Sequence, residues 1–172
     1  MALRNMVYEG DPQLRKKSRE ITEFGKRTAD LMDDLKDTLT EQKGLGLAAP
    51  QVGVLRRAVV IVNGDEMIEL INPEIIENSG EVRLKEACLS CPGVYGYVTR
   101  PQFVKVKAVD RNGQEFLMEC EEMTARAACH EIDHLNGVLF VDLAEKILSE
   151  DDFDEEDDFE DEFDDDIEIK EE

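Results

Sequence analysis

The sequence predicts an α+β protein. Antiparallel or mixed sheets should pack around a central helix that carries an HExxH motif, with an N-terminal helix and a disordered acidic C-terminal tail. Three observations favour this class. Two segments have helical periodicity, several short segments read as strands, and two of these strands are joined by hairpin turn chemistry. Strands and helices do not alternate in the way that a doubly wound parallel sheet requires.

The charge of the chain is unevenly distributed. The formal net charge is -22 over 172 residues, and residues 150–172 contain 17 acidic residues and one base, Lys170. The rest of the chain therefore holds 25 acids and 19 bases, an ordinary balance for a soluble domain. We expect one domain over residues 1–148 and a tail over residues 149–172 that self-repulsion keeps disordered.

The composition argues against several classes of function. The mildly acidic body lacks the clustered Lys and Arg that bind a phosphate backbone, which disfavours a direct nucleic-acid partner. No stretch approaches the roughly 20 apolar residues of a membrane helix, and the N-terminus has no signal-peptide run. We therefore expect a cytoplasmic protein without a membrane partner, with its four cysteines reduced.

The expected elements follow in chain order. Residues 10–12 (GDP) predict a turn, and apolar residues from Phe24 to Leu39 at three- and four-residue spacing predict a helix that Gly44 ends. Strands are expected over Ala58–Asn63 and 69–72, with Pro73 ending the second. Phe103–Val109 and 115–120 should pair through the turn at 110–113, and a second helix should span 121–136.

The second helix contains HEIDH, an HExxH motif. His130 and His134 are four residues apart and therefore lie on one helical face, where both imidazoles can reach one ion. Glu131 borders that face and can exchange protons with a water that the ion activates, because a divalent ion lowers the pKa of its water to about 7. The alternative is a helix with two structural histidines and an incidental glutamate.

A catalytic ion needs a third protein ligand and a free position for water. Cys88 and Cys91 offer thiolates on an expected loop, and Cys88 with the two histidines suits zinc or ferrous iron. If Cys91 also binds, the site becomes a closed structural zinc site. Downstream, only Asp142 and Glu145 are near enough to serve instead. Cys120 and Cys129 are expected to be buried thiols.

Residues 44–51 read GLGLAAPQ and include a GxGxxA pattern. The context argues against dinucleotide binding, because a helix precedes the pattern where a strand is needed, and Pro50 interrupts the following helix. The glycines can instead let the backbone approach a bound peptide, while Gln51 offers an amide donor to a developing negative charge. A simple Gly-rich connection between helix and strand is the alternative.

The segments GLGLAAPQ, EACLS and HEIDH, in this order and at these separations, closely resemble the peptide deformylases. The resemblance runs from VYEGDP at residues 7–12 to about Leu143. It implies that Cys88, His130 and His134 bind the ion and that Glu131 is the general acid/base. It also implies that Gln51 and the Leu89 backbone N–H stabilise the oxyanion, and that the Leu45–Gly46 backbone aligns the substrate as an added strand.

The resemblance also implies a function: hydrolysis of the formyl group from the N-terminal formyl-methionine of nascent chains, with release of formate. One divalent ion is expected, ferrous iron, with zinc or nickel also accommodated. A cytoplasmic monomer that associates with the ribosome is expected. Two positions depart from the family pattern: Ala87 replaces a usual glycine, and Cys91 places a second thiol beside the site, which should increase its sensitivity to oxidation.

Three functions compete on the sequence: the deformylase, a structural zinc protein that binds a partner, and a metallopeptidase that cuts internal bonds. The acidic tail lies outside the resemblance. It is expected to be a solvated extension, although its spaced Phe and Ile residues also allow docking on a basic partner.

Overall fold

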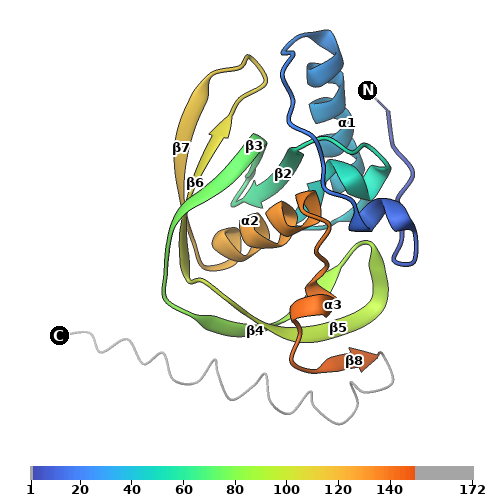
Figure 1. Cartoon of the computed structure of the whole chain (residues 1–172), viewed down its shortest axis with the longest axis vertical. Coiled ribbons are helices and arrows are strands. Elements are labelled where there is room, and N and C mark those ends of the chain that lie inside the picture. The colour runs from blue at the N-terminus through green and yellow to red at the C-terminus, as the bar shows by residue number, and fades with distance from the viewer. Residues whose placement is uncertain (1, 150–172) are drawn as a thin grey trace, which may run out of the picture.

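The computed structural model describes residues 2–149. These residues form two long helices, one short helix, two 3₁₀ helices and eight strands in two sheets (Figure 1). The helical elements are η1 (Pro12–Arg15), α1 (Lys26–Gln42), η2 (Ala49–Val52), α2 (Glu122–Leu135) and α3 (Phe140–Leu143). The strands are β1 (Gly46–Ala48), β2 (Ala58–Asn63), β3 (Glu66–Ser79), β4 (Val82–Cys88), β5 (Cys91–Arg100), β6 (Phe103–Val109), β7 (Glu115–Glu121) and β8 (Ile147–Ser149).

The strands form a five-stranded sheet in the order β1-β2-β3-β6-β7 and a three-stranded sheet in the order β4-β5-β8. All strand pairs are antiparallel, and among the described residues a parallel bridge occurs only between Arg19 and Arg56. The expected α+β class with antiparallel sheets is confirmed. The predicted hairpin of β6 and β7 is also confirmed, with Val109 opposite Glu115 beside the turn.

The core is built on both faces of β2. Ala58 and Val60 pack with α1, whereas Val59 and Ile61 on the opposite face pack with α2. Burial on both faces explains why AVVIV is continuously apolar instead of alternating. Figure 1 shows α2 in the middle of the molecule, with the strands around it. The central helix is therefore fixed by the five-stranded sheet on one side.

The β4-β5 hairpin lies across α2 from the five-stranded sheet (Figure 1). A third apolar cluster holds it against η1 and α3, with Leu14, Val98, Leu139 and Phe140 packed around Cys88 and Cys91. This hairpin brings Cys88 to the helix that carries the histidines, although 42 residues separate Cys88 from His130 in the sequence.

Several expectations about local structure were wrong. Helix α1 ends at Lys43, which takes the left-handed conformation (φ 57°) that was assigned to Gly44. The second strand does not stop at Pro73: β3 continues through a bulge at Asn72, whose φ is 49°. The Asn72 side chain exchanges two 2.9 Å hydrogen bonds with the backbone of Ile21, which stabilises this conformation. The segment around Cys88 and Cys91 is a tight hairpin and not a loop.

The predicted second helix occupies Glu122–Leu135, with Gly137 at its exit in a positive-φ conformation. The turn predicted at residues 10–12 is present, and Asp11 caps η1. Ser149, the first residue of the predicted tail, is the last residue of β8 and pairs with Val94 of β5. The tail from residue 150 lies outside the described residues. None of the described helices has the combination of length and apolar character that a membrane span needs.

Candidate metal centre

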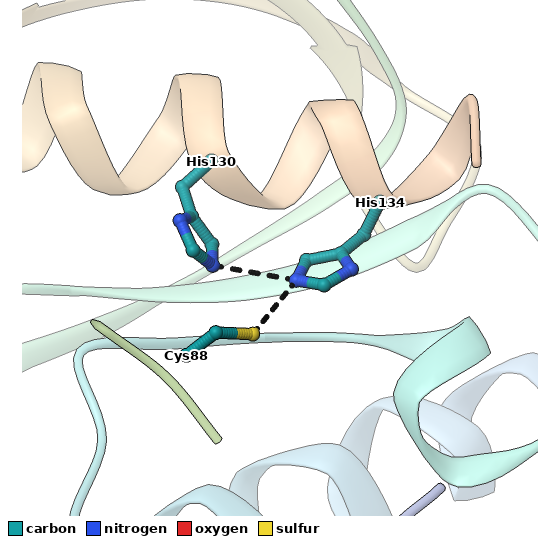
Figure 2. Close-up of side chains that lie close together, drawn as sticks. All are labelled: Cys88, His130 and His134. Atoms are coloured by element: carbon teal, nitrogen blue, oxygen red, sulfur yellow. Dashed lines mark hydrogen bonds between the residues drawn. The ribbon is translucent and has the colours of Figure 1, made fainter. Parts of the chain in front are cut away.

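Three potential metal ligands from two elements converge beneath α2 (Figure 2). The Cys88 Sγ lies 3.3 Å from Nε2 of His134, which lies 3.3 Å from Nε2 of His130. All three ligand atoms lie within 4.8 Å of one another. The two histidines come from successive turns of α2, and Cys88 ends β4. The structure therefore brings together the three residues that were predicted as ligands.

The orientation of His130 is set by Glu86. The Nδ1 atom of His130 lies 2.9 Å from a Glu86 carboxylate oxygen, so Nδ1 carries the proton and Nε2 keeps a lone pair toward Cys88 and His134. Burial lowers the pKa of His134 well below its ordinary value, which keeps that ring neutral. Neutral imidazoles are the form that binds metal ions.

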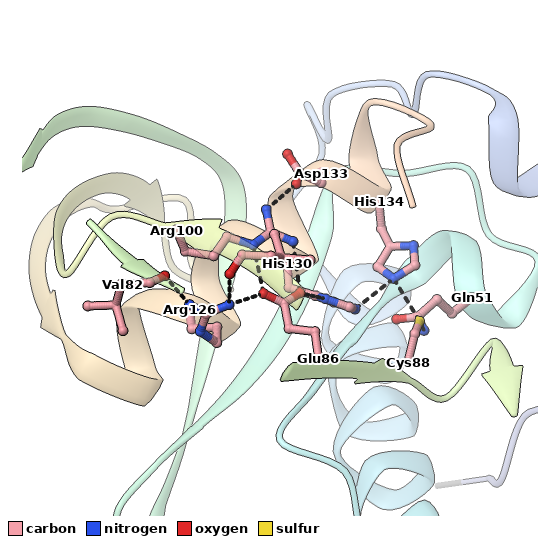
Figure 3. A network of polar contacts seen from close by, with 10 residues as sticks. Gln51, Val82, Glu86, Cys88, Arg100, Arg126, His130, Asp133 and His134 are labelled. Carbon is pink, nitrogen blue, oxygen red and sulfur yellow. Dashed lines mark hydrogen bonds and ion pairs between the residues drawn. The ribbon is translucent and has the colours of Figure 1, made fainter. Parts of the chain in front are cut away.

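Glu86 is held by two buried arginines (Figure 3). Arg100 donates to both carboxylate oxygens at 2.9 and 3.0 Å, and Arg126 donates to one of them. Arg100 also contacts Asp133, and Arg126 also donates to the carbonyls of Val82 and Val98. Burial favours the neutral acid, but the hydrogen bonds from His130 and Arg100 outweigh it and lower the pKa of Glu86 to about 2. The carboxylate is therefore ionised at neutral pH.

The donor set fits one divalent cation. A thiol and two imidazole nitrogens facing each other suit zinc or ferrous iron, and three protein ligands leave a position for water. Cys91 does not belong to the group of three, although it stands opposite Cys88 in the hairpin. This arrangement disfavours the closed four-ligand zinc site. Asp142 binds Arg15 and caps α3, and Glu145 binds Arg83, so neither acid joins the group.

Glu131 lies beside the ligands in a closely packed setting. Its side chain is 4% exposed, and its Oε2 has no hydrogen-bond partner among the described residues. Burial raises the pKa of Glu131 to about 7. Gly46 provides the space for this side chain, because a Cβ at Gly46 would lie 2.7 Å from both Cγ and Oε1 of Glu131. A buried carboxyl group with a raised pKa therefore lies beside the three candidate ligands.

Gln51 is oriented by its own carbonyl oxygen. The Gln51 Oε1 accepts a 2.9 Å hydrogen bond from the Ala48 N–H, which turns the amide NH₂ toward the ligand cysteine. The Nε2 lies 3.2 Å from Ser90 Oγ and 3.6 Å from Cys88 Sγ. The Gln51 amide therefore lies next to the three candidate ligands. Leu89 follows Cys88 in the hairpin turn, and its side chain reaches Gly44.

A cleft of about 600 Å³ opens onto these residues. It is lined by Gln51, Cys88, Leu89, His130 and Glu131, and by half-exposed apolar side chains at its rim, Tyr8, Leu45 and Met123. Strand β1 forms one wall and is the edge of the five-stranded sheet.

The open side of β1 has unpaired backbone groups. The Leu45 carbonyl accepts from the Val62 N–H, so Leu45 faces β2. In an antiparallel ladder the next residue, Gly46, directs its N–H and C=O to the other side, toward the cleft. Ala48 obeys the same alternation, because its N–H bonds to Gln51 and not to β2. An extended chain can therefore add to this edge.

The comparison with known proteins agrees with this geometry. A model of the polypeptide deformylase family matches residues 3–149. The chain belongs to this family. It is 54% identical over 155 residues to the peptide deformylase of Caldicellulosiruptor bescii, covering 90% of this chain and 93% of that relative.

Solved deformylase structures share the fold. The crystal structure of a peptide deformylase from Legionella pneumophila matches with a TM-score of 0.80 and 43% identity, over 83% of this chain and 86% of that chain. The one from Thermotoga maritima matches with a TM-score of 0.82 and 35% identity, over 85% and 100%. The predicted family and its activity are confirmed: deformylases are metal-dependent hydrolases that use a single divalent metal and act on formyl-methionine N-termini.

The sequence did not predict the residues that orient the candidate ligands through hydrogen bonds, namely Glu86, Arg100 and Arg126. Glu86 entered only as the first residue of the EACLS segment, and Arg100 and Arg126 were not singled out. One signal was available: Arg126 stands four residues before His130, on the same face of an Ala-rich helix, where an arginine requires a buried partner.

Proposed function

We propose that this chain hydrolyses the formyl group from N-terminal formyl-methionine with one divalent ion held by Cys88, His130 and His134. The observation that supports the proposal is the convergence of these three ligand atoms within 4.8 Å, at a cleft that Glu131 also lines. When bound, the ion supplies Lewis acidity that makes water available as a nucleophile at neutral pH. We propose ferrous iron, with zinc or nickel also accommodated by the same donor set.

Glu131 is the proposed general acid and base. Its carboxylate accepts a proton from the attacking water and returns it to the amine that leaves as formate is released. The Oε2 atom has no other hydrogen-bond partner among the described residues, so it is free to take the proton. Gly46 lets the carboxylate occupy this position, because a side chain at residue 46 would collide with it.

Gln51 and the backbone N–H of Leu89 are the proposed oxyanion donors. The Gln51 amide is fixed by Ala48 before substrate binds, so its donor needs no reorientation as charge develops on the formyl oxygen. Leu89 follows the ligand Cys88 directly in the chain, which places its N–H at the same end of the hairpin.

The substrate peptide is proposed to pair with the open edge of β1. Leu45 and Gly46 then align it by backbone hydrogen bonds, a mode that reads no side-chain sequence beyond the first residue. Apolar side chains of the cleft, Leu45, Leu89 and Met123 among them, suit the methionine side chain.

The test is formate release from a formyl-methionine dipeptide by wild-type protein, Glu131→Gln and the control Glu119→Gln. Glu119 is exposed on β7 and is not among the residues that line the cleft. We expect Glu131→Gln to keep its metal content and lose turnover by about 100- to 10,000-fold, with the control unchanged. Full activity of Glu131→Gln would remove its catalytic role.

The same assay separates the competing functions. Cleavage of unformylated peptides at internal bonds would identify a metallopeptidase, and metal binding without turnover would identify a structural zinc protein. Metal analysis of anaerobically purified protein identifies the ion.

Four further features belong to the proposal. They are a catalytic domain at 1–148 that includes the HExxH helix, an acidic tail at 149–172, a cytoplasmic monomer, and association with the ribosome. Comparing ribosome binding with and without residues 150–172 tests whether the tail contributes.

A further inference from the structure

The site holds a second cysteine that the proposed mechanism does not use. Cys91 begins β5, and its backbone stands directly opposite Cys88 in the hairpin, with only Leu89 and Ser90 between them. Both thiols are buried, at 8% exposure for Cys88 and 2% for Cys91, and both residues line the cleft. A small solute that enters the cleft therefore meets a pair of thiols.

The backbone separation of this pair matches that of a disulfide. Residues directly opposite each other in an antiparallel pair have Cα atoms about 4.5–5.5 Å apart. Disulfides join Cα atoms about 4.4–6.8 Å apart, so the separation expected for this pair, which follows a register shift at Ala87, lies within the range of a disulfide. The other two cysteines lack such a partner position, because Cys120 stands opposite Val104 in its strand pair and Cys129 lies on a helix.

We propose that Cys88 and Cys91 form a redox-reactive dithiol that hydrogen peroxide converts into a disulfide, releasing the metal ion reversibly. The disulfide itself depends only on the hairpin, whereas the release of the ion rests on the proposed role of Cys88 as a ligand.

The chemistry needs one equivalent of peroxide. One sulfur attacks a peroxide oxygen, the O–O bond breaks, and a sulfenic acid and one water result. The second sulfur attacks the sulfenic sulfur, the S–S bond forms, and the S–O bond breaks with loss of a second water. Two thiols are oxidised, one peroxide is reduced, and two waters leave.

Cys91 therefore decides the fate of an oxidised site. A lone ligand cysteine passes from the sulfenic to the sulfinic and sulfonic acids, which reductants do not reverse. Here the adjacent thiol captures the sulfenic acid first, and a dithiol reductant restores both cysteines. Cys91 should thus limit irreversible damage to the ligand.

The experiment compares wild type, Cys91→Ala and the control Cys120→Ala, each in the metal-loaded form and after removal of the metal by a chelator. Each is treated with peroxide, then with a dithiol reductant and zinc. The readouts are the intact mass, the mass of the tryptic peptide that begins at Glu86, the free thiol count and the bound metal. None depends on activity.

In both wild type and Cys120→Ala, this peptide should lose two free thiols and the mass of two hydrogen atoms. The wild-type chain starts with four free cysteines. The metal-loaded form should react more slowly. Reduction should restore zinc binding in both proteins, whereas Cys91→Ala should gain oxygen on Cys88 and stay unable to bind zinc.

Oxygen addition to Cys88 in the wild type without a disulfide would overturn the proposal. Recovery of zinc binding by reduced Cys91→Ala, equal to that of wild type, would overturn the protective role of Cys91. A disulfide that forms while the metal stays bound would instead overturn Cys88 as a ligand, and with it the proposed metal site, but not the dithiol.

Discussion

Replacing Glu86 by glutamine tests the support of the metal site. The carboxylate is 6% exposed and accepts hydrogen bonds from Arg100, Arg126 and His130. Glutamine keeps the shape but offers one acceptor oxygen and no charge. Arg100 keeps its contact with Asp133, whereas Arg126 keeps only backbone carbonyls, so a buried guanidinium loses its counter-charge.

Removing one partner of a buried ion pair costs about 3–5 kcal/mol, because the remaining charge stays desolvated. A domain of this size has about 5–15 kcal/mol of unfolding free energy. Since each kcal/mol shifts the melting temperature of such a domain by about 2–4 °C, Glu86→Gln should lower it by roughly 10 °C. The loss of the acceptor at His130 Nδ1 should also weaken metal binding by about 10–100-fold.

The measurements are denaturant unfolding of metal-free protein and competition with a chelator for zinc. Glu69→Gln is the matched control, since Glu69 also accepts two hydrogen bonds from one arginine, Arg111, but lies away from the cleft and is more exposed. It should lower stability less and leave zinc affinity unchanged. The reasoning is refuted if Glu86→Gln unfolds within about 1 kcal/mol of wild type, or if both variants bind zinc equally well.

Two further predictions concern packing at Glu131 and pH. Gly46→Ala should displace the Glu131 carboxylate and lower kcat by about 100-fold at unchanged metal content. The control is Gly25→Ala, because a Cβ at Gly25 meets nothing within 4 Å and should leave kcat unchanged. Equal kcat values for the two variants would contradict the packing argument. Burial raises the pKa of Glu69, but hydrogen bonds from Arg111 and Lys36 outweigh it and hold the pKa below the ordinary 4.5. The difference in unfolding free energy between wild type and Glu69→Gln should therefore be largest at neutral pH and shrink as the pH falls below about 4.5. Urea unfolding at a series of pH values measures this difference. A difference that stays constant across pH would exclude a contribution from Glu69 ionisation.

Local patterns predicted the elements whose character is set by neighbours in the chain. The stripe from Phe24 to Leu39 predicted α1, and the turn at residues 110–113 predicted the β6-β7 pair. The spacing of His130 and His134 predicted a shared helical face for the same reason. Such features need no knowledge of tertiary contacts.

Elements that depend on distant contacts were not predictable in this way. Strand β3 continues past Asn72 because the side chain of that residue bonds to Ile21, 51 residues earlier. Strand β4 contains Arg83, Lys85 and Glu86, which hide its apolar alternation. Glu86 is buried only because Arg100 and Arg126 come from β5 and α2 to neutralise it. A single sequence does not reveal such pairings.

The strand geometry of β4 also explains why Ala87 is tolerated where the family pattern has glycine. Successive residues of a strand point to opposite faces, so the side chains of Glu86 and Cys88 share one face of β4 and the side chain of Ala87 lies on the other. Glu86 and Cys88 are buried against α2, whereas Ala87 is exposed and lines the cleft. Ala87 is also absent from the residues with positive φ, so a Cβ imposes no backbone strain. The methyl group of Ala87 therefore narrows the cleft and points away from the side chains of Glu86 and Cys88.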